Sequence, residues 1–537
     1  MYYMESVASK KRKAIFIIFL MVGILIFSRS ITISHNMYLH CDEHVFYNAA
    51  QSLKGYLSGS SPVYEEEKEY PEGAIVLQLP FHILTAIINR LTGAGISPQL
   101  SGRIASVFYF ICAAILGFVI IFRHFSARAH TLIIYSLIVS FSIMHIEQSR
   151  YGTGDAISFF LLMAVILLTA AAISSDRHAF ALIVFSAFVA GGLCAVKYPL
   201  IVFFSITVFG AISLCKKGLK ISKPLFAVIL LFAFYIGFAI LSPKAVFDPS
   251  YIWRASTREL GAYMGTEVSR LALLWKNTLS VLTYSMFYSG FPMMPVFLTI
   301  TFAQRWRTVD NTNYLSILFN RMIPALVVIF FMYNLSVATL AMRSFYPFFF
   351  IGDIYVSAYI GNLLFSSNNF KRTIILILTG ILSLRGAYLI FLMSDNSDSS
   401  RMSHMIADAV DSKWNKTTVL SGQLIFADGY QEFPGLNIVD ITDERFSNPE
   451  TMIVQEGELM ITGARSFENG AFEFDFLPFD FGTNQTLLKW LEIEKENEPY
   501  YVGRLYPKYY YYLFGSWIYV ATGNGAEFPN CTIYYRG

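Results

Sequence analysis

The sequence predicts a polytopic α-helical membrane protein that ends in a small soluble α/β domain. Its 537 residues are 55% hydrophobic and only 14% charged, and the mean hydropathy is +0.50. Soluble proteins carry roughly 25% charged residues, so this deficit is typical of a chain that lies mostly in lipid. The 49 Phe and 33 Tyr suit lipid-facing surfaces and the aromatic belts at membrane interfaces.

The net charge does not favour nucleic acid as a partner, and the cysteines do not predict a metal site. A formal net charge of +3, with no basic tract interleaved with aromatic residues, does not fit nucleic-acid binding. The five cysteines show no spacing of a metal-ligand set.

Apolar runs of spanning length predict about eleven transmembrane helices. These runs are 14–31, 104–122, 130–146, 156–174, 179–195, 199–214, 224–241, 277–302, 322–342, 344–365 and 373–393. The basic stretch 10–13 precedes the first run, and no small-residue cleavage site follows it. We therefore expect an uncleaved first span with a cytoplasmic N-terminus, in a plasma membrane or a bacterial inner membrane.

The run 74–92 is ambiguous, because it contains Gln78, Pro80 and His82. Lys and Arg collect in cytoplasmic loops, and most basic clusters would fall outside if this run crossed the membrane. The clusters are Arg123/Arg128, Arg177, Lys216/Lys217/Lys220/Lys223, Arg305/Arg307/Arg321 and Lys371/Arg372. We therefore interpret 74–92 as a re-entrant or juxtamembrane segment of the outer leaflet.

This topology places several polar segments on the external side. They are the loop 32–103, the turn near 147–155, the loop 242–276 and everything from about residue 394. From there the composition becomes polar, with short alternating runs at 417–421 and 437–441. We predict a transmembrane domain over 1–393 and an extracytoplasmic α/β domain over 394–537, which is an ordinary domain size.

Acidic residues at the external helix ends are the first candidates for chemistry. Asp42, Glu43 and His44 follow the first span, and Asp155 opens the run 156–174. Asp42 also begins a short amphipathic helix that we expect to lie on the membrane, with apolar residues at helical spacing. Each aspartate is equally consistent with helix capping, and capping is compatible with a functional role. Charged groups at such positions mark chemistry or transport.

Two basic residues also lie on the external side, against the general trend. Lys197 occupies a very short turn, and Arg343 lies between two long apolar runs. Either cation suits a lipid phosphate, and Arg offers a bidentate fork for it. Snorkelling to lipid headgroups is the alternative for each. Glu69 and Tyr70 end the polar part of the first loop and are further candidates near the substrate.

These motifs, in this order and on one side of the membrane, resemble the membrane glycosyltransferases of the C superfamily. The resemblance is strongest to the branch with the protein O-mannosyltransferases and the lipid A aminoarabinose transferase, and it covers nearly the whole chain. The motifs are Asp42-Glu43, Tyr70-Pro71-Glu72-Gly73, Gly102-Arg103-Ile104-Ala105-Ser106, Ser149-Arg150-Tyr151 with Asp155, Lys197-Tyr198, Arg343 with Tyr346-Pro347, and in the tail Ser400-Arg401 and 530–536. Glu72 departs from the family, which often has a second proline there.

The resemblance implies a GT-C fold and inverting transfer of a sugar from a polyprenyl-phosphate donor to a glycan, lipid or protein acceptor. It implies that Asp42 is the general base. Asp155 would orient the acceptor, or hold a divalent cation such as Mg²⁺ or Mn²⁺ with Asp42 or Glu69. Lys197 and Arg343 would stabilise the charge on the departing lipid phosphate. The neighbours Glu43 and His44 would tune Asp42 only modestly.

A lipid or solute transporter, or a flippase, is the main alternative function. Transporters place ionisable residues near the membrane midplane, between broken helices. The predicted spans carry almost no charge in their interiors, with Arg385 as the exception. We therefore favour chemistry at the membrane interface over transport. A polytopic scaffold protein would give no reason for acids and bases to gather on one side.

We predict that Asp42→Asn lowers the transfer rate by roughly 10²–10⁴-fold, because the variant cannot accept the proton of the acceptor. The measurement is sugar release from polyprenyl-phosphate donors by the purified protein. Expression and thermal stability should stay nearly unchanged. An unfolded variant would instead support the capping role, and full activity would remove the base assignment.

Overall fold

The computed structural model describes residues 7–32, 72–125, 128–150, 152–219, 221–243, 294–336 and 345–366, short helical pieces within 250–282 and 373–387, and five strands within 418–535. Contacts divide the chain into two compact units. The first contains Met1–Ile33 and Asp42–Ile390, and the second contains Ser34–Cys41 and Phe391–Gly537.

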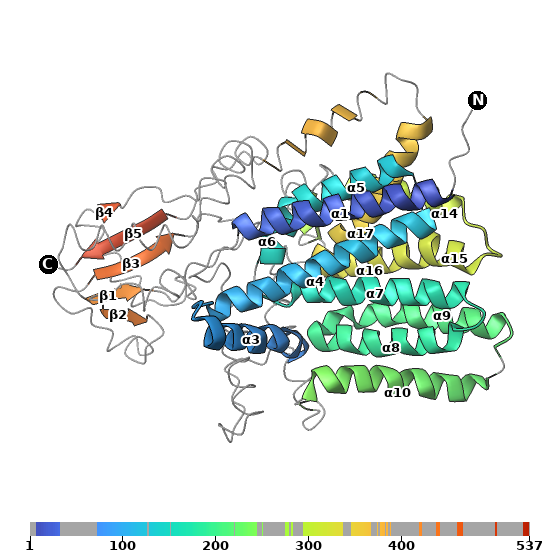
Figure 1. Cartoon of the computed structure of the whole chain (residues 1–537), viewed down its shortest axis with the longest axis horizontal. Coiled ribbons are helices and arrows are strands. Elements are labelled where there is room, and N and C mark those ends of the chain that lie inside the picture. The colour runs from blue at the N-terminus through green and yellow to red at the C-terminus, as the bar shows by residue number, and fades with distance from the viewer. Residues whose placement is uncertain are drawn as a thin grey trace. The chain divides into compact units, whose positions relative to one another are not determined.

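The first unit is a helical bundle, seen from the side in Figure 1. Its helices are α1 (Val7–Thr32), α3 (Glu72–Thr92), α4 (Pro98–Ile120), α5 (Ala129–Phe141), α6 (Ile143–Arg150), α7 (Asp155–Ser174), α8 (Ala179–Val196), α9 (Phe204–Lys216), α10 (Lys223–Leu241), α14 (Met294–Arg307), α15 (Tyr314–Ile317), α16 (Ile323–Leu335) and α17 (Tyr346–Ser366). Two π-helical turns, η1 (Ile121–Phe125) and η3 (Leu318–Met322), and a 3₁₀ turn, η2 (Tyr198–Phe203), continue or join them.

Within the described residues, nine helical segments are long and apolar enough to cross a membrane. Eight of these segments coincide or overlap with predicted spans, and the ninth is α3. Exposed apolar side chains cover their outer faces, for example Phe19 on α1 and Phe232 on α10. The described part of the chain is therefore that of an integral membrane protein, while the predicted number of about eleven spans stays a prediction.

Helix α3 lies at one end of the bundle, beside the first half of α4 (Figure 1). Its first residue, Glu72, accepts a hydrogen bond from Ser242, which follows α10. One and a half turns later, Gln78 donates to the carbonyl of Gly152, just before α7 begins. The last residues of α10 and the first residues of α7 therefore meet α3, and we call this end of the bundle the α3 end.

Helix α3 contains the run 74–92, whose placement in the membrane was ambiguous from the sequence. The segment forms a regular helix despite Pro80, and by length and composition it could span a membrane. Two of its polar contacts go to the ends of α7 and α10, and a third joins the Leu77 carbonyl to the Tyr109 hydroxyl in the middle of α4. The predicted re-entrant or juxtamembrane placement stays a prediction.

The predicted span 130–146 is wrong as a single helix. Helix α5 ends at Phe141, and α6 starts at Ile143 after Ser142, whose backbone is extended (φ −68°, ψ 120°). Carbonyl groups left without a helical partner inside lipid need another donor. Arg29 supplies it, with Nη1 donating to the carbonyl of Ser140 at 2.9 Å. A side chain from a different helix thus stabilises the break, which a run of apolar residues does not reveal.

Helices α8 and α10 approach each other through glycine. A methyl group added at Gly191 of α8 would lie 1.9 Å from the carbonyl oxygen of Phe234, and one added at Gly237 of α10 would lie 1.9 Å from that of Phe188. Membrane helices lack a hydrophobic driving force for association, so small residues that allow close backbone packing stabilise their contact.

The second unit contains a mixed five-stranded sheet with the order β2-β1-β3-β5-β4. The strands are β1 (Thr418–Ser421), β2 (Asn437–Asp440), β3 (Leu459–Ala464), β4 (Tyr500–Tyr501) and β5 (Asn530–Tyr535). Strand β1 pairs in parallel with β2 and β3, and β5 runs antiparallel to β3 and β4. Strands β1 and β2 occupy the two alternating runs identified in the sequence. The described residues of this unit are all in strands, so the predicted α/β character and the boundary at 393/394 stay predictions.

We predict that Gly237→Ala destabilises the bundle by about 1–3 kcal/mol or more, because the new methyl group forces α8 and α10 apart. Thermal unfolding of the detergent-solubilised protein measures this. Gly23→Ala in α1 is the matched control, since no atom lies within 4 Å of the added methyl group. Equal unfolding temperatures of the two variants would contradict the proposed close packing.

Candidate active site

An ion pair between Lys197 and Asp155 forms the centre of the candidate site, at the α3 end of the bundle. The Lys197 Nζ lies 2.9 Å from Asp155 Oδ1. Sequence analysis singled out both residues and placed both on one side of the membrane, but it gave them separate roles. The structure brings them into direct contact.

Local structure explains why Lys197 projects at this point. Helix α8 ends at Val196, and the Lys197 backbone is extended (φ −155°, ψ 101°). Pro199 follows in the first turn of the 3₁₀ segment η2, where its missing N–H costs no helical hydrogen bond. The chain therefore leaves α8 abruptly, and its first charged side chain stands at the helix end.

Asp155 is held by the turn that precedes α7. It is the first residue of that helix, and Gly154 is the N-cap, so the alternative that Asp155 caps α7 is wrong. Thr153 Oγ1 donates to Asp155 Oδ2 at 3.3 Å, and Gln78 and Ser106 hold the turn through the carbonyls of Gly152 and Thr153. Both carboxylate oxygens are thus oriented, and one of them faces Lys197.

The two charges differ in their access to solvent. The Lys197 side chain keeps 25% of its accessible surface and that of Asp155 only 9%. A partly desolvated pair attracts more strongly than one in water, because the effective dielectric constant is lower. An ammonium group has three donors, and among the contacts of the described residues Lys197 uses one of them. The site can therefore hold an anion at Lys197 while Asp155 keeps the ammonium in place.

Glu72 is a site residue that sequence analysis treated only as a departure from the family. It is 3% exposed, and Ser242 Oγ donates to its Oε2 at 3.2 Å. The neighbouring Gly73 lies directly against the backbone of Ala195 and Val196, where a methyl group would come within 2.6 Å. This contact brings the start of α3 to the chain just before Lys197. The available signal in the sequence was the carboxylate of Glu72, which follows Pro71 just before the apolar run 74–92.

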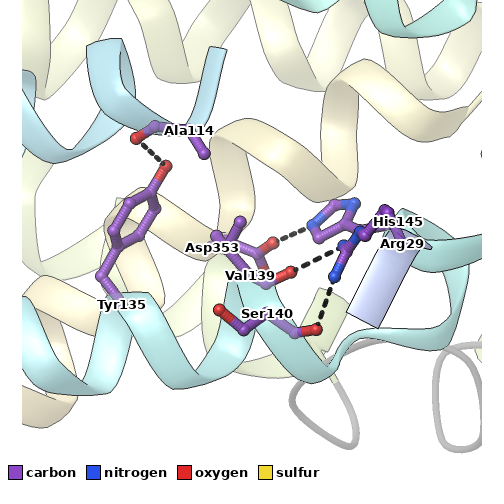
Figure 2. Close-up of polar contacts among 7 residues, drawn as sticks. All are labelled: Arg29, Ala114, Tyr135, Val139, Ser140, His145 and Asp353. Carbon is purple, nitrogen blue, oxygen red and sulfur yellow. Dashed lines mark hydrogen bonds and ion pairs between the residues drawn. The ribbon is translucent and has the colours of Figure 1, made fainter. Parts of the chain in front are cut away.

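A second polar cluster lies among α1, α6 and α17, and sequence analysis missed it (Figure 2). His145 and Asp353 form a buried pair through Nε2 and Oδ2, each 1% exposed. Arg29 is fully buried beside them, and besides the Ser140 carbonyl it contacts the carbonyl of Val139 and the hydroxyl of Ser149. The expectation of almost charge-free spans, with Arg385 as the exception, is therefore wrong. Arg29 and Asp353 lie within predicted spans, and their burial requires partners from other helices.

An aromatic contact connects the two clusters. The ring of Tyr346, at the start of α17, lies 4.1 Å from that of Phe159, one turn after Asp155. Tyr346 also contacts His145 edge to face at 5.1 Å. The start of α17 thus meets the start of α7 at the α3 end.

The other predicted site residues lie outside the described residues. They are Asp42, Glu43, His44, Glu69, Tyr70 and Arg343, and the same holds for Arg385. Their predicted roles stay predictions.

The predicted divalent cation stays a prediction, because its predicted ligands Asp42 and Glu69 lie outside the described residues. No group of three or more His, Cys, Asp or Glu side chains among them could hold a metal ion. Asp155, the predicted ligand that is described, already faces the positive charge of Lys197. A second cation at the same carboxylate would be repelled by the ammonium.

Comparisons with known proteins add a partial likeness of fold. No protein-family model and no curated protein matches the chain. Among solved structures, the oligosaccharyltransferase of Archaeoglobus fulgidus with zinc and sulfate is 10% identical, with 77% of this chain and 61% of that chain covered and a TM-score of 0.43. ArnT from Cupriavidus metallidurans in the apo state is 11% identical, with 90% and 95% covered and a TM-score of 0.49.

A third structure, AglB from Archaeoglobus fulgidus with an inhibitory peptide and a dolichol-phosphate, is 11% identical, with 76% and 63% covered and a TM-score of 0.44. The chain thus spans about three fifths of the length of the oligosaccharyltransferase structures. All are membrane glycosyltransferases with the GT-C fold, the superfamily that the sequence resembles. With TM-scores below 0.5 the likeness is partial, and the function proposed for this chain rests on its own residues.

We predict that Asp155 and Lys197 are energetically coupled. Asp155→Asn and Lys197→Met should each destabilise the protein, because each leaves the partner's charge partly buried and unpaired. The double variant should lose about 1–3 kcal/mol less than the sum of the two single losses. Thermal unfolding of the four proteins measures the coupling, and strict additivity would show that the pair contributes nothing.

Proposed function

We propose that the chain is an inverting glycosyltransferase of the membrane, which moves a sugar from a polyprenyl-phosphate donor to an acceptor at the α3 end. The observation that supports this most directly is the Lys197–Asp155 pair, an oriented and partly accessible ammonium at a helix end. Such a group suits a phosphate that arrives from the lipid phase with its charge at the membrane interface.

In this mechanism Lys197 binds the phosphate of the donor. As the bond between the anomeric carbon and the phosphate oxygen breaks, its electron pair stays on that oxygen. Lys197 stabilises the growing negative charge, which is the step where electrostatic stabilisation has its largest effect. Asp155 does not touch the reacting atoms. It is a positioning residue that keeps the ammonium in a fixed place before the reaction starts.

The acceptor attacks the anomeric carbon from the opposite face and forms the new glycosidic bond with inversion. Asp42 accepts the proton that the acceptor nucleophile loses. Arg343, on the chain that leads to Tyr346, would share the phosphate with Lys197.

The acceptor is a glycan, a lipid or a protein on the outer face of a plasma or bacterial inner membrane, where the α3 end would lie. In the predicted topology the N-terminus is cytoplasmic, so α1 delivers the chain to that face. The ends of α8 and α10 and the start of α7 form the described part of the site. In this topology all three lie on the external side as well.

A transporter is the second candidate, and one observation favours it. Arg29, His145 and Asp353 lie at a break between α5 and α6 inside the bundle, which is how transporters arrange their ionisable residues. The cluster is fully buried, however, and the Lys197–Asp155 pair keeps access to solvent. A reaction at the bundle end requires that access, so we place the transferase first.

We predict that Lys197→Met lowers the transfer rate by roughly 10²-fold or more, since it removes one donor to the developing charge. The assay is sugar release from a panel of polyprenyl-phosphate sugars. Lys217→Met is the matched control. Lys217 donates to the carbonyl of Ile173 at the far end of α7 and should be dispensable.

The two candidate functions give different results with the same proteins. A transferase releases sugar from the donor in detergent, whereas a transporter moves an intact donor across proteoliposomes and cleaves nothing. Unchanged sugar release by Lys197→Met, with the variant folded, would remove the phosphate role from this residue. Movement of intact donor without cleavage would favour the transporter.

A further inference from the structure

A polar cavity lies at the end of the bundle opposite the α3 end. Helix α17 begins at the α3 end, where Tyr346 meets Phe159, and the cavity lies near its other end. The cavity volume is about 370 Å³, among α14, η3 and α17. Its lining consists of Thr301, Gln304, Arg305, Thr308, Asn320, Tyr359, Asn362 and Leu363. The residues that form the Lys197–Asp155 site take no part in it.

Arg305 is the charged residue of this lining, and its guanidinium is held in one orientation. It lies 4.2 Å above the ring of Phe125 and 5.6 Å from that of Tyr355. Its Nη1 donates to Asn320 Oδ1 at 3.0 Å. Within the described part of the chain no carboxylate pairs with Arg305, so its charge and most of its five donors remain available.

Two π-helical turns meet beside the cavity. His124 of η1 stacks on Phe319 of η3 with 4.8 Å between ring centroids. The Tyr355 hydroxyl donates to the Phe319 carbonyl at 2.5 Å, inside η3. π-helical turns hold well under 1% of residues and are frequent at functional sites. The convergence of two such turns, from distant parts of the chain, at one arginine indicates a site rather than an accident of packing.

The exposed side chains around the cavity have the composition of a membrane boundary. Trp306 and Ile300 of α14 are 49% and 41% exposed, and Arg307 is exposed next to them. An apolar helix face that ends in Trp and Arg is typical of the membrane–water interface. A ligand that reaches the cavity can therefore come from the lipid phase as well as from water.

We propose that this cavity binds the phosphate group of a membrane lipid headgroup. A guanidinium offers a planar fork that matches two phosphate oxygens, and the side chains of Gln304 and Tyr359 in the lining supply neutral hydrogen bonds to the rest of the headgroup. The proposal does not depend on the proposed transferase function, since the two sites lie at opposite ends of the bundle.

The test uses the full-length protein in nanodiscs of phosphatidylcholine, with phosphatidic acid added as the lipid phosphate and inorganic phosphate as the soluble one. Phosphatidic acid should raise the unfolding temperature of the wild-type protein in a saturable way. Arg305→Gln should weaken this apparent affinity about tenfold or more, because the charged hydrogen bonds are lost. Arg307→Gln, two residues away and exposed, should respond like the wild type.

Arg305→Lys tests the site in case the Gln variant does not fold. It keeps the charge and loses the fork, so phosphatidic acid should raise its unfolding temperature less than that of the wild type, each measured against the same protein in phosphatidylcholine. An equal response of wild type and Arg305 variants overturns the site. Stabilisation by inorganic phosphate alone, without any effect of phosphatidic acid, overturns the assignment to a lipid headgroup.

Discussion

A charge inside an apolar bundle must find its partner on another helix, and this constraint shapes every polar cluster described here. Desolvating an ion costs several kcal/mol unless opposite charge and hydrogen bonds compensate. Asp155 meets Lys197, Asp353 meets His145, and Arg29 meets the carbonyl groups at the break between α5 and α6. Each contact fixes the relative position of two or three helices, so the charges specify the packing of an otherwise uniform apolar bundle.

The polar clusters differ in how deeply they are buried and in which end of the bundle they occupy. The Lys197–Asp155 pair stands at the α3 end with partial access to water, and the Arg29 cluster lies fully buried beneath it. Through Phe159 and Tyr346 the buried cluster supports the starts of α7 and α17, which carry the site. The buried charges can therefore be understood as the framework of an interfacial site. This explains ionisable residues inside the spans without requiring a transport pathway through them.

The two ends of the bundle carry cations in different settings. Lys197 is held by a carboxylate, so its neighbourhood is close to neutral and it attracts an anion less strongly than a cation without a paired carboxylate would. Arg305 is held by aromatic faces and an amide, and it keeps its net charge. The first setting suits a phosphate that is a substrate and product. The second suits a headgroup that stays bound.

The sequence by itself determined the membrane class and the positions of most helices, and it predicted that Asp155 and Lys197 gather on one side of the membrane. Such features depend on runs of about twenty residues and on the charges that flank them, which are local properties of a chain in lipid. Only the tertiary structure decided which charged side chains contact each other. Lys197 and Asp155 are separated by 42 positions and His145 and Asp353 by 208, and their contact depends on how the helices pack. The break at Ser142 and the burial of Glu72 were hidden for the same reason, because each is stabilised by a group that a distant helix supplies.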